Sequence, residues 1–153
     1  MTTARPDILC VGAVLWDVIG RSPAPMAPGA DVPGRIRHLP GGVALNVAAA
    51  LAARGQSVAV LGAVGQDPEG ESLLAAVRAL GVATDWMQRL PDWPTDIYMA
   101  IEDPRGLIAA IADAHSLEAA GDKVLAPLRD GTFGSGQAPW RGTVVIDGNL
   151  TVP

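Results

Sequence analysis

Seven residues lie where strands are expected to end or helices to begin, and their types could together bind a ligand. Carboxylate and amide side chains that converge on one cleft suit a molecule with many hydroxyl groups, because each can engage a pair of hydroxyls. Adjacent glycines allow backbone conformations closed to other residues, and they let a ligand approach the backbone closely. The candidate residues are Asp17, Gly41, Gly42, Asn46, Asp113, Asp147 and Asn149.

Three polar residues also have a structural interpretation. Asn46 is the one polar residue in the first turns of an apolar helix that runs on over residues 47–54, and a buried amide there must either tie down a neighbouring loop or face a polar ligand. By itself this pattern favours the structural role. Asp17, expected at the carboxyl end of the first strand, either caps a turn or contacts a ligand. Asp67 precedes Pro68 and is expected to cap the next helix.

Alternating strand and helix signals predict an α/β protein with a mostly parallel sheet and a small β appendage. The apolar runs that predict buried strands cover residues 7–15, 57–64 and 143–147. The helical patterns cover residues 47–54, 69–80 and 116–128. A Pro- and Gly-rich irregular segment covers residues 20–34, and a hairpin is expected over residues 95–112.

Length and composition limit the function classes. The chain has 153 residues, about the length of one domain, and 49% of them are hydrophobic, so a substantial core is possible. The net charge is −5 and no Lys/Arg cluster occurs, which argues against a nucleic-acid partner. Cys10 is the only cysteine and the chain has two histidines, which argues against a disulfide and a His-rich metal site. Without a signal peptide or a run of about 20 apolar residues, we expect a cytoplasmic protein and no membrane partner.

Several enzyme classes lack their motifs. No Walker A, HExxH or GxSxG pattern occurs, so a P-loop enzyme, a zinc protease and a serine hydrolase are unsupported. A Rossmann-type dehydrogenase is disfavoured, because GAVLWD at residues 12–17 stands where GxGxxG would be expected.

Two motifs resemble a known family. GGVALNVAAALAARG at residues 41–55, followed by LGAVGQDPEG at residues 61–70, closely resembles the first signature of the ribokinase-like (PfkB) sugar and nucleoside kinases. Within that family, TDIYMAI at 95–101, AIAD at 110–113 and VIDGNL at 145–150 are most similar to pseudouridine kinases. The resemblance covers residues 7–151, but only the N-terminal half of such an enzyme.

The resemblance implies a ribokinase-like, three-layer, Rossmann-type and mostly parallel sheet with a small β lid. Residues 1–153 would form the N-terminal part of one such domain, with lid segments at about 18–39 and 95–112. The implied activity is ATP-dependent transfer of a phosphoryl group to the 5-hydroxyl of a ribose.

The family pattern also implies roles for individual residues. Asp17 and Asn46 would hold the ribose hydroxyls, and the backbone at Gly41 and Gly42 would close on the sugar. The lid residues expected at the substrate are Thr95, Tyr98, Ile111 and Asp113. Asn149 would lie towards the phosphate and magnesium region.

The second signature of the family, close to DTxGAGD, does not occur in the chain. That segment would supply the catalytic Asp and an anion hole, so we expect no catalytic residue, no metal ligand and no kinase activity in this chain alone. ATP and Mg²⁺ are expected to serve the complete enzyme and not to bind firmly here. The alternatives are a non-catalytic remnant that binds a nucleoside or pairs with another subunit, and a kinase for another sugar such as ribose or fructose. A homodimer through the lid or an exposed sheet edge is also expected.

Overall fold

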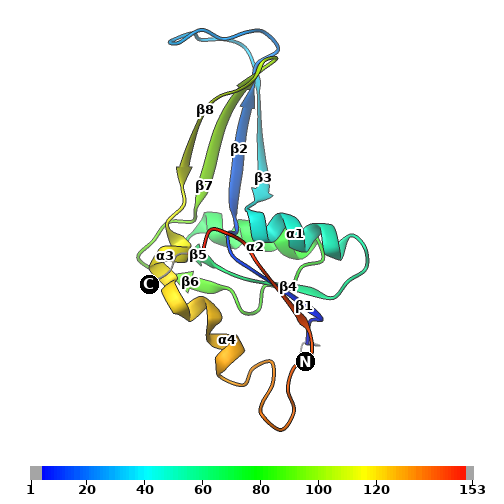
Figure 1. The fold of residues 1–153 in the computed structure, drawn as a ribbon. Helices are drawn as coiled ribbons and strands as arrows, with labels where there is room; N and C mark the ends of the chain where they lie inside the picture. The colour runs from blue at the N-terminus through cyan, green and yellow to red at the C-terminus, as the bar shows by residue number, and fades with distance from the viewer. Residues whose placement is uncertain (1–4, 151–153) are drawn as a thin grey trace.

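A parallel sheet forms the base of the body, and the computed structural model describes residues 5–150 (Figure 1). Strand β1 (Ile8–Val11) lies in the middle, between β4 (Val58–Leu61) and β9 (Thr143–Ile146). Leu9, Cys10 and Val11 are fully buried, as expected for a parallel strand that is covered on both faces. A second parallel pair consists of β5 (Ala63–Gly65) and β6 (Gln88–Leu90).

Helices cover both faces of this sheet, which confirms the predicted three layers. On one face, α1 (Val43–Ala52) and α2 (Pro68–Ala79) pack against Cys10 and Val60. On the other face, Leu9 and Val11 contact Val124 and Phe133 from the segment after the hairpin. The predicted 116–128 helix is present there as three consecutive short helices: α3 (Ser116–Ala120), the 3₁₀ helix η1 (Gly121–Leu125) and α4 (Ala126–Arg129).

Two of the strand predictions are wrong in detail. The apolar run over residues 7–15 is not one strand, because β1 ends at Val11 and β2 (Leu15–Arg21) enters a different sheet. Asp17 therefore lies inside β2 rather than at the end of a core strand. The last strand, β9, is not buried but forms an edge of the sheet, and 61% of Ile146 is exposed.

The prediction that Asn46 is buried is also wrong. Helix α1 begins at Val43, so Asn46 lies within its first turns. Only one face of the helix packs on the sheet, through Ala44, Leu45 and Ala48, and Asn46 is exposed. Its amide therefore needs no internal partner, and the burial argument for a structural role does not hold.

A four-stranded sheet projects from the body (Figure 1). Its strand order is β3 (Arg35–Gly41), β2, β7 (Ile97–Asp103) and β8 (Gly106–Asp113), and β7 and β8 form the predicted hairpin. Trp16, at the base of β2, donates a 3.1 Å hydrogen bond from Nε1 to the carbonyl of Glu69 in α2. This contact fixes the base of the projecting sheet to the body.

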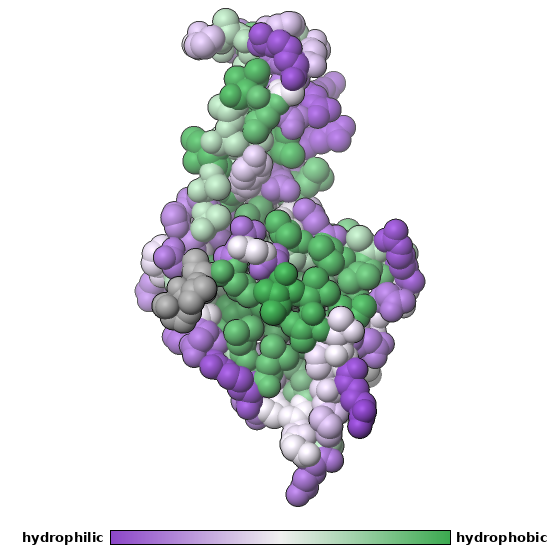
Figure 2. All heavy atoms as spheres, viewed as in Figure 1, coloured by the Kyte–Doolittle hydropathy of each residue, from purple (hydrophilic) through white to green (hydrophobic). Residues whose placement is uncertain are grey.

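The two faces of the projecting sheet differ in chemistry. Asp17 pairs with Leu39 on β3 and with Tyr98 on β7, and directly opposed residues share one face of a sheet. We call this side the Asp17 face. The opposite side, the Ile111 face, carries exposed apolar residues: Ile36, Met99, Ile101 and Ile111. Figure 2 shows hydrophobic residues on the projecting sheet and over the middle of the body, where β9 crosses in Figure 1.

Candidate functional site

A cavity of about 400 Å³ lies where the Asp17 face meets the body. It is bounded by β2, the start of α1, β7, the start of α3 and the turn after β9. Its lining residues are Ala13, Leu15, Asp17, Gly42, Val43, Asn46, Asp96, Tyr98, Ala112, Ala114, Leu117, Glu118 and Asn149. The sequence-predicted residues Asp17, Gly42, Asn46, Tyr98 and Asn149 are thus brought together from four parts of the chain.

Gly41 and Gly42 shape the wall of this cavity. A Cβ atom on Gly41 would overlap the Asp17 carboxylate, so glycine leaves room for that side chain to lie against the end of β3. Gly42 is the N-cap of α1 and has φ of 100°, where a side chain would also overlap the carbonyl of Ala13. The protein's own Asp17 and Ala13 thus lie close to this pair, and the close approach of a ligand stays a prediction.

Five polar side chains in the cavity have no hydrogen-bond partner within residues 5–150. They are the carboxylates of Asp17 and Glu118, the amides of Asn46 and Asn149, and the hydroxyl of Tyr98. Burial raises the pKa of Asp17 above its ordinary value. These groups are free to bind a ligand, and together they offer acceptors and donors to a molecule that carries several hydroxyl groups.

Asp147, by contrast, has a structural position. Its Oδ2 atom accepts hydrogen bonds from the amides of Ala13 (2.7 Å) and Ala44 (3.2 Å), and its Oδ1 atom accepts one from the amide of Asn149 (2.7 Å). The carboxylate thus ties the end of β9 to the turn after β1 and to the first turn of α1. Its contribution to the cavity is to hold Asn149 in place.

Asp67 also has the structural role that the sequence predicts. Oδ1 accepts a 2.7 Å hydrogen bond from the amide of Gly70 and caps α2, with Pro68 in the first turn. Its carboxylate accepts further hydrogen bonds from the hydroxyl of Thr95 (2.5 Å) and the amide of Thr95 (2.8 Å). Burial by itself would raise the pKa of Asp67, but the hydrogen bonds from Thr95 and Gly70 hold it below its ordinary value.

Three expected contact residues lie outside the cavity. Thr95 is buried against Asp67. Ile111 is opposite Met99 in the strand pairing and is 70% exposed on the Ile111 face. Asp113 shares that face and lies 3.7 Å from Nε2 of His115. The physical reason is strand alternation, because residues 111 and 113 point away from the side that Ala112 occupies.

Sequence reasoning missed Asp96 as a residue of the site. Asp96 is 8% exposed and accepts hydrogen bonds from the hydroxyl (2.7 Å) and amide (3.1 Å) of Ser116 and from the amide of His115 (3.2 Å). Burial raises the pKa of Asp96, against the opposing effect of these hydrogen bonds. Its carboxylate fixes the start of β7 to the start of α3. The sequence marks Asp96 as a site residue only by a charge that stands directly before an apolar strand.

Within residues 5–150, no group of three or more His, Cys, Asp or Glu side chains is arranged to hold a metal ion. None of the helices in that part of the chain is long and apolar enough to cross a membrane.

Comparison with known proteins places this geometry in a family. The family model described as pfkB family carbohydrate kinase matches residues 5–129. The chain belongs to the PfkB family of carbohydrate kinases. The prediction made from residues 41–55 and 61–70 is therefore confirmed.

Individual PfkB relatives agree with this assignment. The chain is 34% identical to the uncharacterized sugar kinase YeiI of Escherichia coli over 97% of its own length and 40% of that protein. It is 35% identical to the pseudouridine kinase of Escherichia coli over 69% of its own length and 34% of that protein. The chain thus spans well under half the length of these two relatives.

Solved structures confirm the ribokinase-like fold class. A carbohydrate kinase from Agrobacterium tumefaciens aligns with a TM-score of 0.72 at 28% identity. The alignment covers 94% of this chain and 45% of that protein, so the structure has the α/β architecture of part of a PfkB domain. In this chain, the cavity lies at the junction between the body and the projecting sheet.

Proposed function

We propose that this chain is the substrate-binding part of an ATP-dependent sugar or nucleoside kinase of the pseudouridine type. The observation that carries the proposal is a set of unpartnered polar side chains in one cavity, among them Asp17, Asn46, Tyr98 and Asn149. Asp67, Asp96 and Asp147 all have protein partners, whereas Asp17 has none within residues 5–150. A half-buried carboxylate without a protein partner gains most from a ligand that donates hydrogen bonds.

In this proposal, Asp17 accepts hydrogen bonds from two neighbouring ribose hydroxyls and Asn46 binds a third polar group of the sugar. Tyr98 covers the ligand from the projecting sheet, which acts as a lid and excludes water. Asn149, held by Asp147, lies towards the hydroxyl that receives the phosphoryl group. The similarity to pseudouridine kinase supports this substrate over ribose or fructose.

The phosphoryl donor of the complete enzyme is, in this proposal, ATP with Mg²⁺, drawn from the cytoplasm. The donor set for a metal is poor in the described part of the chain, where no acidic cluster is arranged around a common point. Phosphoryl transfer needs positioned charges around the transferred group, and GAGD does not occur in the chain. We therefore propose that this chain binds the sugar but does not turn over ATP by itself.

A second role, pairing between copies, is favoured by the Ile111 face. Ile36 is 78% exposed and Ile111 70% exposed, and both lie on one side of the projecting sheet. We propose that two copies bury this face against each other. Sedimentation should show a dimer that Ile111→Lys converts to a monomer, and a monomeric parent protein would contradict the pairing.

Calorimetric titration tests the binding proposal. Pseudouridine should bind saturably, and Asp17→Asn should weaken binding about tenfold or more, because a hydrogen bond to a charged group contributes about 1.5–3 kcal/mol. Asp85→Asn is the matched control, since Asp85 is exposed and lies outside the cavity. Equal affinity of the parent and Asp17→Asn would refute the role of Asp17. Tighter binding of ribose or fructose than of pseudouridine would refute the substrate.

A further inference from the structure

The projecting sheet carries a second cavity, of about 600 Å³, on its Asp17 face. Its apolar floor and walls come from Ile19, Leu39, Pro23 and Pro33. Its polar residues are Arg21, Ser22, Arg35, Arg37 and Glu102. We call this cavity the arginine groove.

Strand pairing explains why the arginines gather there. Ile19 pairs with Arg37, and Arg21 pairs with Arg35 and, on its other side, with Glu102. Alternate residues of a strand point to the same face, so these side chains follow Asp17 and Leu39 along one side of the sheet. The arginine groove therefore begins about 7 Å from Asp17, two residues further along β2.

The charge of the groove is not balanced by its own residues. Glu102 accepts a 2.9 Å hydrogen bond from Nε of Arg21 and pairs with that guanidinium. Arg35 and Arg37 form no ion pair with any residue in the range 5–150. Three arginines and one glutamate give a local charge of +2, in a chain whose net charge is −5.

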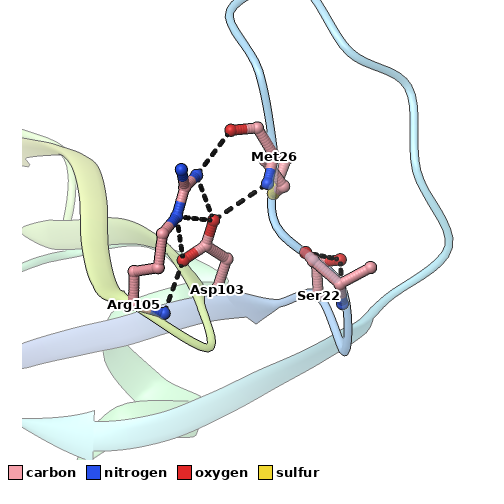
Figure 3. Close-up of polar contacts among 5 residues, drawn as sticks. Ser22, Met26, Asp103 and Arg105 are labelled. Atoms are coloured by element: carbon pink, nitrogen blue, oxygen red, sulfur yellow. Dashed lines mark hydrogen bonds and ion pairs between the residues drawn. The ribbon is translucent and has the colours of Figure 1, made fainter.

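The loop that walls the groove is held by polar contacts to the end of β7 and the turn after it (Figure 3). Asp103, 4% exposed, accepts a 2.9 Å hydrogen bond from the amide of Met26, and Arg105 donates one of 2.7 Å to the Met26 carbonyl. The hydroxyl of Ser22 donates to the carbonyl of Ala24 at 2.8 Å. The start of the 22–34 loop is therefore fixed to the β7–β8 turn, close in sequence to Ser22 and Pro23, which line the groove.

We propose that the arginine groove binds the anionic group of a small phosphorylated or carboxylated molecule. Arg35 and Arg37 contact the anion, because a planar guanidinium matches the oxygen atoms of a phosphate or carboxylate in pairs. Ile19, Leu39 and the two prolines pack against the apolar part of the ligand. A volume of about 600 Å³ is in the range of small-molecule sites. This site is separate from the sugar cavity and does not depend on the proposed function.

Nuclear magnetic resonance titration of the ¹⁵N-labelled chain tests the inference with three probes: uridine 5′-monophosphate, uridine and inorganic phosphate. The monophosphate and phosphate should shift the amide signals of residues 19–23 and 34–39, and uridine alone should not shift those of residues 34–37. Arg37→Gln and Arg35→Gln should each weaken binding of the monophosphate about fivefold or more. Raising the salt concentration should weaken binding of the parent protein, because the arginines are exposed.

Arg54→Gln is the control, because Arg54 is an exposed arginine just after α1 whose guanidinium donates its one hydrogen bond within residues 5–150 to the Ala50 carbonyl. The inference fails if neither anionic probe shifts residues 19–23 or 34–39, or if Arg54→Gln weakens binding as much as Arg37→Gln. It also fails if the arginine substitutions change the oligomeric state and leave anion binding unaltered. Asp17→Asn distinguishes the two sites, since it should weaken nucleoside binding and leave phosphate binding in the groove unchanged.

Discussion

Alanine substitutions at the two adjacent glycines should separate binding from folding. The three atoms nearest to a Cβ atom on Gly41 all belong to the carboxylate of Asp17, which can turn away. Displacing a side chain from its preferred rotamer costs about 0.5–1.5 kcal/mol, so Gly41→Ala should lower the free energy of unfolding by about that amount. Because Asp17 leaves its position, the affinity for pseudouridine should fall about tenfold or more, as expected when a hydrogen bond to a charged group is lost.

Gly42→Ala should act on stability instead. Its φ of 100° disfavours any residue with a side chain, and the added Cβ atom would overlap the Ala13 carbonyl, which is backbone and cannot turn aside. Strained backbone of this kind costs about 1–3 kcal/mol, and the overlap adds to it. We expect the free energy of unfolding to fall by about 3 kcal/mol or more, out of the roughly 5–15 kcal/mol typical of a domain.

Urea denaturation followed by tryptophan fluorescence measures the stability of each variant, and calorimetry with pseudouridine measures its affinity. Gly55→Ala is the control, because Gly55 also has a positive φ, of 79°, but nothing lies within 4 Å of an added Cβ atom. Its loss should be about 1–2 kcal/mol, from backbone strain alone. If Gly41→Ala destabilises the protein as much as Gly42→Ala, or binds pseudouridine as tightly as the parent, the reasoning on the cavity wall is refuted.

Three further substitutions test the contacts around the site. Asp67→Ala removes the helix cap and the acceptor for Thr95, so urea denaturation should show a loss of about 2–4 kcal/mol, and a loss below about 0.5 kcal/mol would contradict the cap. Because the pKa of Asp67 is lower in the folded state than in the unfolded state, its carboxylate stabilises the folded state at pH values above the unfolded pKa, which is near 4. In the parent protein this contribution should disappear as the pH falls through the lowered pKa. Asp67→Ala lacks the carboxylate and should not show this loss. Asp96→Ala leaves the Ser116 amide and hydroxyl without their acceptor, so the free energy of unfolding should fall by about 1–3 kcal/mol. Amide hydrogen exchange in β7 and β8 should become faster, and unchanged exchange would show that Asp96 does not fix the projecting sheet. Trp16→Phe keeps a ring but loses the hydrogen bond to α2, and thermal unfolding should reveal a loss of about 0.5–1.5 kcal/mol or more, whereas no loss would mean that this contact does not secure the base of the sheet.

Much of the architecture could be predicted from local patterns. The cap at Asp67 and the β7–β8 hairpin follow from turn chemistry and from the alternation of apolar residues, which are properties of neighbouring residues. The three layers follow from the resemblance to the ribokinase-like family. The break after Val11 could not be found in this way, because the chain is almost continuously apolar from β1 through to Leu15, the first residue of β2. Strand pairing is what separates them, since β1 pairs within the core sheet and β2 within the projecting one.

The sequence alone determined the family and the residue types of the site, because the motif from Gly41 to Asn46 and the one ending at Asp67 depend on short-range spacing. Only the tertiary structure decided which polar residues are left free. Asp17 and Asp96 look alike in sequence, yet folding gives Asp96 three hydrogen-bond donors from α3 and leaves Asp17 with none in the described chain. Likewise, the pairing of β2 with β3 aligned the arginines beside Ile19. Hydrogen-bond partners and shared faces come from segments distant in the chain, so no local pattern specifies them.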